Sequence, residues 1–135
     1  MKTSLKPGLE KTESVIVDRT RVVRHMGEHM GVYATPAMVN DIEQVCRDLL
    51  LEHLDPGEDS VGTRVDVQHL GATPEGMSVE LSAKVSAVDR RAVTFEAVVR
   101  DALEEVGRCT HTRFVVDVAK IKERLAAKIA KAKER

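Results

Sequence analysis

The sequence predicts an α+β fold in which an antiparallel sheet is wrapped around one long helix, with a second helix at the C-terminal end. Two observations support this prediction. Residues 35–53 carry apolar side chains at helical spacing, whereas the segments after them alternate as strands and are separated by short turns. A helix with one apolar arc buries that arc against a sheet. The length of 135 residues fits a single domain over residues 1–135.

The first half of the chain contains one strand and the long helix. Residues 9–18 alternate and end in Val15-Ile16-Val17, which predicts a strand. Residues 21–34 include glycines and predict a loop or a broken turn. Thr35-Pro36 is typical of a helix start, with Thr35 as the N-cap and Pro36 at the first helical position. The helix is expected to end near His53, because a turn signal follows it.

The second half predicts four consecutive strands, at residues 61–69, 77–88, 92–102 and 106–118. One side of the first strand is expected to face the helix, and it comprises Val61, Thr63, Val65, Val67 and His69. A single sheet wrapped around one helix is the hot-dog arrangement. Because a sheet of this size leaves its edges open, we expect two copies to form a homodimer.

The composition excludes several classes of protein. Aromatic residues make up 2% of the chain and Trp is absent, so platforms that stack nucleic-acid bases are not expected. Apolar runs are far shorter than the ~20 residues of a membrane span. The first residues lack the apolar stretch of a secretory signal, and two cysteines make no disulfide framework. These features predict a cytoplasmic protein without a membrane partner.

The charge is distributed unevenly along the chain. Residues 118–135 hold seven Lys or Arg and two Glu, a net charge of +5, whereas the rest of the chain has a net charge of −6. This basic tail predicts a helix with one narrow apolar stripe of Val118, Ile121, Leu125 and Ile129. The tail is either a solvated helix or a surface that attracts a polyanion. Nucleic-acid binding is not favoured, because the body of the protein is acidic and poor in aromatic residues.

Three polar residues interrupt the apolar patterns and are candidates for chemistry. Glu43 lies at the border of the helix's apolar arc, where it either reaches solvent or serves in acid–base catalysis. His69 continues the inward side of its strand and is either a core histidine or a base in a pocket. Thr35 is either a helix cap or a group that attacks or binds a substrate carbonyl. Because helix and strand face each other, we expect Glu43 and His69 to converge.

Other residues carry weaker signals. The polar side of the helix contains Asp41 and is expected to face solvent, whereas Cys46 lies on the apolar arc and is expected in the core. His25 and His29 lie four residues apart, but their surroundings do not match the His-Glu-x-x-His zinc pattern and no third ligand is defined. We therefore expect no metal site.

Several stretches resemble a known family. They are Val23-Arg24-His25, Ala34-Thr35, Leu54-Asp55-Pro56-Gly57-Glu58, Ser60-Val61-Gly62-Thr63, Ala72-Thr73-Pro74 and the segment from Gly107 to Arg113. Together with Glu43 and His69 they span about residues 7–120. The chain is similar to the thioesterase-like hot-dog proteins, and most closely to the fluoroacetyl-CoA thioesterase branch. Thr35, Glu43 and His69 keep the separations of the catalytic Thr, Glu and His of that branch.

The resemblance implies a function and the residues that perform it. It implies that Thr35, Glu43 and His69 are catalytic and that a homodimer holds the acyl site near its interface, with coenzyme A along the surface. It also suggests that Gly62 and the segment from Gly107 to Arg113, with Arg113 as its binding residue, line the thioester or coenzyme site. We therefore expect hydrolysis of an acyl-CoA thioester, with coenzyme A present only as part of the substrate and no separate cofactor. The alternative is a non-catalytic protein that binds acyl-CoA or a related small molecule.

One segment departs from the fluoroacetyl-specific branch. The interval between His25 and Thr35 is short, and Tyr33 is its only aromatic residue, where that branch looks longer and rich in Phe. Tyr33, Met26 and Met30 are expected to meet the acyl group instead. Flexible Met side chains adapt to several acyl shapes. We therefore expect short or medium acyl groups as substrates, without strong selection for fluorine.

Overall fold

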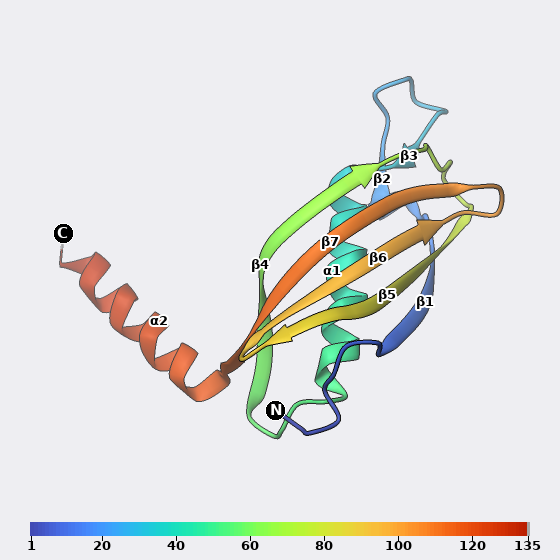
Figure 1. Cartoon of the computed structure of the whole chain (residues 1–135). Coiled ribbons are helices and arrows are strands. Elements are labelled where there is room, and N and C mark those ends of the chain that lie inside the picture. The colour runs from blue at the N-terminus through green and yellow to red at the C-terminus, as the bar shows by residue number, and fades with distance from the viewer. Residues whose placement is uncertain (135) are drawn as a thin grey trace.

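The computed structural model describes residues 1–134 and contains one five-stranded sheet curved around a central helix (Figure 1). The sheet is antiparallel throughout and has the order β1-β5-β6-β7-β4. Its strands are β1 (Glu10–Ile16), β4 (Glu58–His69), β5 (Ser78–Asp89), β6 (Ala92–Arg100) and β7 (Glu105–Asp117). The central helix is α1 (Thr35–Leu51). This arrangement confirms the predicted hot-dog fold.

The helix α1 buries the apolar arc that the sequence predicts. Its buried apolar residues are Met38, Ile42, Val45, Cys46, Leu49 and Leu50. They pack against inward-facing side chains of the sheet such as Leu81, Val85, Phe95 and Val99, and the two layers form one core. Burial of such side chains stabilises the fold by roughly 1.5–3 kcal/mol each. Cys46 is in this core, as predicted.

Residues 17–34 are more ordered than the sequence predicts. They form a short 3₁₀ helix, η1 (Arg19–Arg21), and a pair of two-residue strands, β2 (Val22–Val23) and β3 (Val32–Tyr33). Backbone hydrogen bonds from Tyr33 N to Thr73 O and from Ala34 N to Arg21 O, both 2.8 Å, hold this segment over the start of α1. The strands are too short for their alternation to be visible in the sequence.

The start of α1 differs from the prediction by one residue. Ala34 is the N-cap, and it makes no side-chain cap hydrogen bond, so Thr35 is the first helical residue and does not cap the helix. The prediction was wrong because the Thr35 hydroxyl has another partner, His69. At the other end α1 stops at Leu51, two residues before the predicted end.

A β-bulge in β4 changes which side chains face α1. The register with β7 shifts between Gly62 and Arg64, so Thr63 is the extra residue. Val61 lies opposite the exposed Phe114 and points outward, whereas Val65 lies opposite the buried His111 on the helix side. The prediction that all five alternating residues share one side was therefore wrong for Val61 and Thr63. An extra residue in a strand reverses the alternation that follows it.

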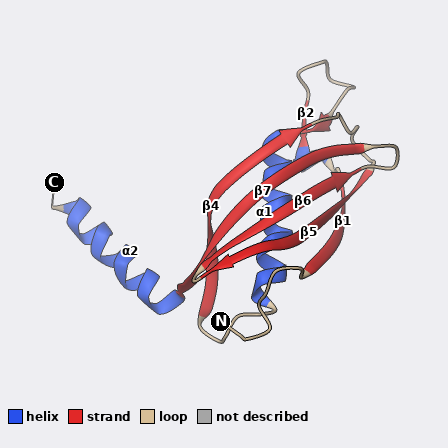
Figure 2. Ribbon diagram, in the orientation of Figure 1, coloured by secondary structure: helices blue, strands red, loops and turns tan. Residues whose placement is uncertain are grey.

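The C-terminal helix α2 (Val118–Lys133) runs away from the sheet beyond β4 and leaves the compact body of the protein (Figures 1 and 2). The Asp117 carboxylate caps it by accepting a hydrogen bond from Lys120 N at 3.2 Å. None of its residues is buried. In the part of the chain described here, residues 1–134, neither helix combines the length and apolar character that a membrane crossing requires.

Candidate active site

A cavity of about 430 Å³ opens at the N-terminal end of α1, beside β2 and β3. The segment β2–β3, the first turn of α1 and the end of β4 with the loop after it form its walls. The lining residues that matter for the chemistry are Val23, Val32, Tyr33, Thr35, Pro36 and His69. Apolar side chains therefore surround a small number of polar atoms, which is typical of a small-molecule site.

Thr35 and His69 meet at this cavity. Thr35 Oγ1 lies 2.7 Å from His69 Nδ1, within hydrogen-bond distance. The Thr35 side chain is exposed, whereas His69 Nε2 is buried and has no hydrogen-bond partner within residues 1–134. When the Thr35 hydroxyl donates to Nδ1, the imidazole proton resides on Nε2. The pair then has the arrangement of an activated nucleophile and its base.

Tyr33 forms a wall beside His69 and is held by a buried ionic network. Its ring meets the His69 ring edge to face, with 6.3 Å between the centroids. Its hydroxyl donates to Asp41 Oδ2 at 2.6 Å, and Arg21 Nε donates to the same oxygen at 2.9 Å. Burial, followed by the bond to Asp41, raises the pKa of Tyr33 above its ordinary value of 10.0. The hydroxyl of Tyr33 is thus committed to Asp41, and only the ring is available to an acyl group.

Asp41 was predicted to face solvent, and this prediction was wrong. It is 5% exposed, because the segment before α1 brings Arg21 and Tyr33 over that side of the helix. The carboxylate and the guanidinium compensate each other's charge in the protein interior. The bond to Asp41 also raises the pKa of Arg21, with burial opposing it. Asp41 therefore positions the ring that contacts His69.

Glu43 belongs to a second polar cluster, farther along α1. Its Oε2 lies 3.3 Å from Arg113 Nη1, and its side chain is 37% exposed. Arg113 comes from β7 and is buried, with Nε donating to Ser60 Oγ at 2.7 Å and Nη2 donating to Ser60 O at 2.9 Å. Burial lowers the pKa of Arg113, and the charge of Glu43 opposes this effect. An arginine remains charged under these conditions, so it fixes the carboxylate of Glu43 in place.

His111 completes this cluster and was not singled out from the sequence. Its side chain is fully buried, and Nδ1 donates to Arg64 O at 2.7 Å because a carbonyl oxygen only accepts. Its Nε2 is then an acceptor for Arg113 Nη1, 3.2 Å away. Burial lowers the pKa of His111 from 6.5, and the bond to the Arg64 carbonyl acts in the opposite direction. A signal for it existed, since His111 shares the inward side of its strand with Cys109 and Val115.

Gly62 provides space for the carboxylate of Glu43. A Cβ atom at this position would collide with Glu43 Oε2 and would lie 3.2 Å from His111 Cε1. The glycine is therefore required by a close approach of side chains to the backbone of β4. Gly62 and Arg113, which the family resemblance placed at the substrate, are both neighbours of Glu43 in this structure.

The two polar clusters are separate within one chain. Thr35 is joined to His69 and Glu43 to Arg113, but no hydrogen bond or ion pair within residues 1–134 joins one pair to the other. Glu43 follows Thr35 by eight positions along the helix, which is a rise of about 12 Å. The expected convergence of Glu43 and His69 is therefore not formed by direct contact in the single chain. Residues 1–134 also contain no group of three or more His, Cys, Asp or Glu side chains placed to hold a metal ion.

Comparison with known proteins places the chain in a family. Residues 17–119 match the model of the fluoroacetyl-CoA-specific thioesterases. The fluoroacetyl-CoA thioesterase of Streptantibioticus cattleyicolor is 31% identical over 135 residues, which cover 95% of this chain and 97% of that protein. A solved structure of a fluoroacetyl-CoA thioesterase has a TM-score of 0.85 and 30% identity, with coverage of 93% of this chain and 98% of that one.

The fold extends to more distant proteins. A thioesterase superfamily member from Thermus thermophilus has a TM-score of 0.89 and 23% identity, with coverage of 98% of this chain and 99% of that one. At this identity the similarity shows the fold alone. The family match and the 31% identity to the Streptantibioticus protein show family membership as well as the fold, because they cover most of the sequence. The chain belongs to the fluoroacetyl-CoA-specific thioesterase family.

Proposed function

We propose that this protein hydrolyses short or medium acyl-CoA thioesters to a free acid and coenzyme A. The observation that carries the proposal is the 2.7 Å contact between Thr35 Oγ1 and His69 Nδ1 at an open, mostly apolar cavity. Family membership supports a thioester as substrate. The walls formed by Val23, Val32 and the ring of Tyr33 suit a small apolar acyl group.

The proposed first step forms an acyl-enzyme. Thr35 Oγ attacks the thioester carbonyl carbon while its proton moves to His69 Nδ1, and the C–S bond then breaks to release the CoA thiolate. Solvent protonates the thiolate, so the proton from Thr35 stays on His69. The oxyanion needs a donor near the start of α1. Pro36 has no N–H and Met38 N donates to Ala34 O at 3.0 Å, so the N–H of Ala37 is the donor we assign.

The proposed second step hydrolyses the acyl group on Thr35. A water molecule attacks the ester carbonyl and gives a proton to a general base, and Thr35 Oγ leaves with a proton from His69. We assign the base to Glu43, whose carboxylate is held by Arg113 and is 37% exposed to solvent. Arg113 then acts through Glu43, because Ser60, Glu43 and His111 occupy its nitrogen atoms. The phosphates of coenzyme A are expected to bind other cations.

The distance between Glu43 and Thr35 is the reason for proposing a homodimer with shared sites. The strand β4 is an edge of the sheet and is open to pairing with a second copy. Antiparallel pairing centred between Val65 and Asp66 would set Gly62 of one chain opposite His69 of the other. Because Gly62 adjoins Glu43, that carboxylate would approach Thr35 and His69 of the partner.

The first experiment measures free thiol release over a panel of acyl-CoA thioesters. We expect turnover with short and medium chains, retention of activity in Thr35→Ser and loss in Thr35→Ala. Mass spectrometry of a quenched Thr35→Ser reaction is expected to detect an acyl group on that residue. Full activity in Thr35→Ala contradicts the nucleophile. Binding of CoA without any thiol release identifies a non-catalytic binder instead.

The second experiment mixes two inactive variants, Glu43→Gln and His69→Ala. With shared sites, randomly mixed dimers regain about a quarter of wild-type activity, because half of the dimers are mixed and each holds one intact site of two. If every site is built from one chain, each site in the mixture keeps one defect and activity stays at the level of the variants. The mixture therefore decides between the two arrangements.

The proposed reaction uses protein side chains and water, so it needs no cofactor besides the coenzyme A of the substrate. We also propose that the protein works in the cytoplasm. Cys46 and Cys109 are buried free thiols, which is compatible with a reducing compartment. Burial raises the pKa of Cys46 to about 12, so this thiol takes no part in the chemistry.

A further inference from the structure

The helix α2 exposes an apolar stripe that no residue between 1 and 134 of its own chain covers. Leu125 and Ile129 are 54% and 55% exposed, and Ile121 is half-buried at the start of the stripe. These residues follow each other at intervals of four, so they lie on one side of the helix. Isolated helices of about this length are marginal in water. The side with the stripe therefore needs a packing partner.

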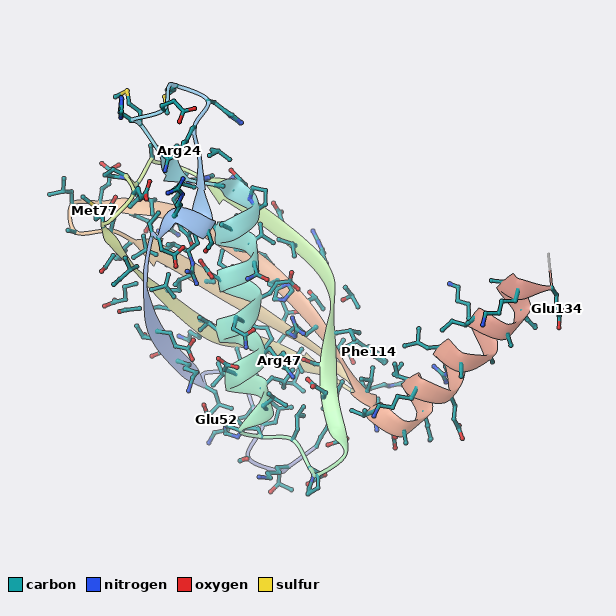
Figure 3. The ribbon with its side chains drawn as sticks, turned by 180° about the vertical axis from the view of Figure 1, so that it is seen from behind. Arg24, Arg47, Glu52, Met77, Phe114 and Glu134 are labelled. Carbon is teal, nitrogen blue, oxygen red and sulfur yellow. The ribbon has the colours of Figure 1, made fainter. Side chains whose placement is uncertain are left out.

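The stripe continues onto the outer face of the sheet. Phe114 is 43% exposed and lies opposite Val61, which is 44% exposed, in the pairing of β7 with β4. Phe114 and Ile121 line a common groove of about 180 Å³ where α2 leaves the sheet. Figure 3 shows Phe114 at this junction. We call Val61, Phe114, Ile121, Leu125 and Ile129 the apolar stripe.

The position of the stripe indicates what covers it. The helix α2 extends beyond β4, on the side where the sheet ends, which is where a chain pairing with β4 would lie (Figures 1 and 3). The 12 residues of β4 alone are few for a stable interface, which involves about 20–30 residues a side. The side of α2 that carries Ile121, Leu125 and Ile129 enlarges this surface.

The charge distribution also favours a second copy of this chain as the partner of α2. Residues 118–135 have a net charge of +5 and the rest of the chain a net charge of −6. A second copy therefore offers an acidic body to the basic side chains that flank the stripe, and opposite charges favour this encounter. The apolar stripe contains no Trp and a single aromatic residue, unlike helices that insert into membrane interfaces.

We propose that α2 is an exchanged arm that packs Ile121, Leu125 and Ile129 on the body of a second copy of this chain, across the edge formed by β4. This inference rests on the homodimer proposed above and is independent of thioester hydrolysis. Each protomer lends one helix to its partner, so the two arms add apolar burial to the backbone pairing of the two β4 edges. The same contact keeps the apolar residues of α2 from binding other proteins.

The test compares two double variants of the full-length protein. Leu125→Glu with Ile129→Glu places two charges on the stripe, whereas Ala127→Glu with Ala130→Glu places the same charges on the opposite side of α2, at 100° per residue. Sedimentation equilibrium gives the dimer Kd of each. We expect the stripe variant to raise Kd at least tenfold and the control to change it less than threefold. Circular dichroism checks that both retain their helices, and Leu125→Ala with Ile129→Ala is the milder variant if the first does not fold.

Several outcomes overturn the proposal. A stripe variant that dimerises with the wild-type Kd shows that α2 takes no part in the dimer, and a wild-type protein that stays monomeric at tens of micromolar shows the same. If Kd is unchanged but the wild type sediments with phosphatidylserine vesicles and the stripe variant does not, a membrane surface is the occupant. Thiol release is measured separately, so loss of hydrolysis and loss of dimerisation are distinguished.

Discussion

Replacing Gly62 by alanine is expected to abolish most activity while leaving stability almost unchanged. The new Cβ would lie well inside the contact distance of Glu43 Oε2, so the carboxylate has to move by roughly 1 Å to restore an ordinary contact. A misplacement of this size at a catalytic group costs about 10²-fold in rate. We therefore expect kcat to fall about 100-fold in Gly62→Ala.

The stability change is small because two effects oppose each other. Moving Glu43 weakens its ion pair with Arg113, and an ion pair with a carboxylate this exposed contributes no more than about 1 kcal/mol. Alanine in a strand is favoured over glycine by roughly 0.5–1 kcal/mol. The free energy of unfolding in urea is therefore expected to stay within about 1 kcal/mol of the wild type.

A double-mutant cycle shows whether Gly62→Ala acts through Glu43. If displacement of the carboxylate causes the loss, Gly62→Ala with Glu43→Gln is no slower than Glu43→Gln alone, because the second change removes nothing further. Additive losses in the cycle would assign Gly62 a separate contact with the substrate. Full activity in Gly62→Ala would refute the whole argument, including the role of Glu43 as the base.

Three further predictions concern the residues around the site. Tyr33→Phe leaves the buried Asp41 with one donor fewer and is expected to lower the unfolding free energy by about 1–3 kcal/mol. Because the ring remains, kcat/KM is expected to change less than tenfold. Equal urea midpoints for the variant and the wild type would contradict the stability prediction. The pKa of His111 is lowered by burial, so the unfolded chain binds more protons than the folded chain as pH falls below 6.5, and stability is lost there. His111→Gln should flatten this loss between pH 7.5 and 5.5, and an unchanged slope would show that other groups cause it. The ratio of kcat/KM for fluoroacetyl-CoA over acetyl-CoA is expected to stay below about 1000, since an apolar pocket discriminates small groups by only ~1–3 kcal/mol.

The sequence predicted the large elements well because their patterns are local. The apolar arc of α1 and the alternation in β5, β6 and β7 repeat over nine or more residues, and the observed bounds agree with the predicted ones to within a few residues. The bulge in β4 was missed because one extra residue leaves no mark in composition. The cap at Thr35 was misassigned for a different reason, since the hydroxyl is bound by His69, 34 residues away in the chain.

The supporting residues of the site were harder to predict than the candidates for catalysis. Thr35, Glu43 and His69 were found by their positions in regular elements and by resemblance to a family. Asp41 was placed in solvent because a helical wheel does not include the segment that later covers it with Arg21 and Tyr33. Each supporting contact joins two different elements, so no spacing along one element reveals it.

The contacts around Glu43 also determine how a loss of activity in Glu43 variants has to be interpreted. Arg113 is buried, and a buried cation without a compensating anion is strongly destabilising. Glu43→Ala would remove both the base and this anion, so a loss of activity there has two explanations. Glu43→Gln keeps an oxygen that accepts from Arg113 Nη1 and removes the negative charge, so it disturbs Arg113 less than Glu43→Ala does. Because Ser60 and His111 still accept hydrogen bonds from Arg113, the variant is expected to fold. Its stability in urea, measured beside kcat, separates the loss of the base from the effect of the uncompensated cation.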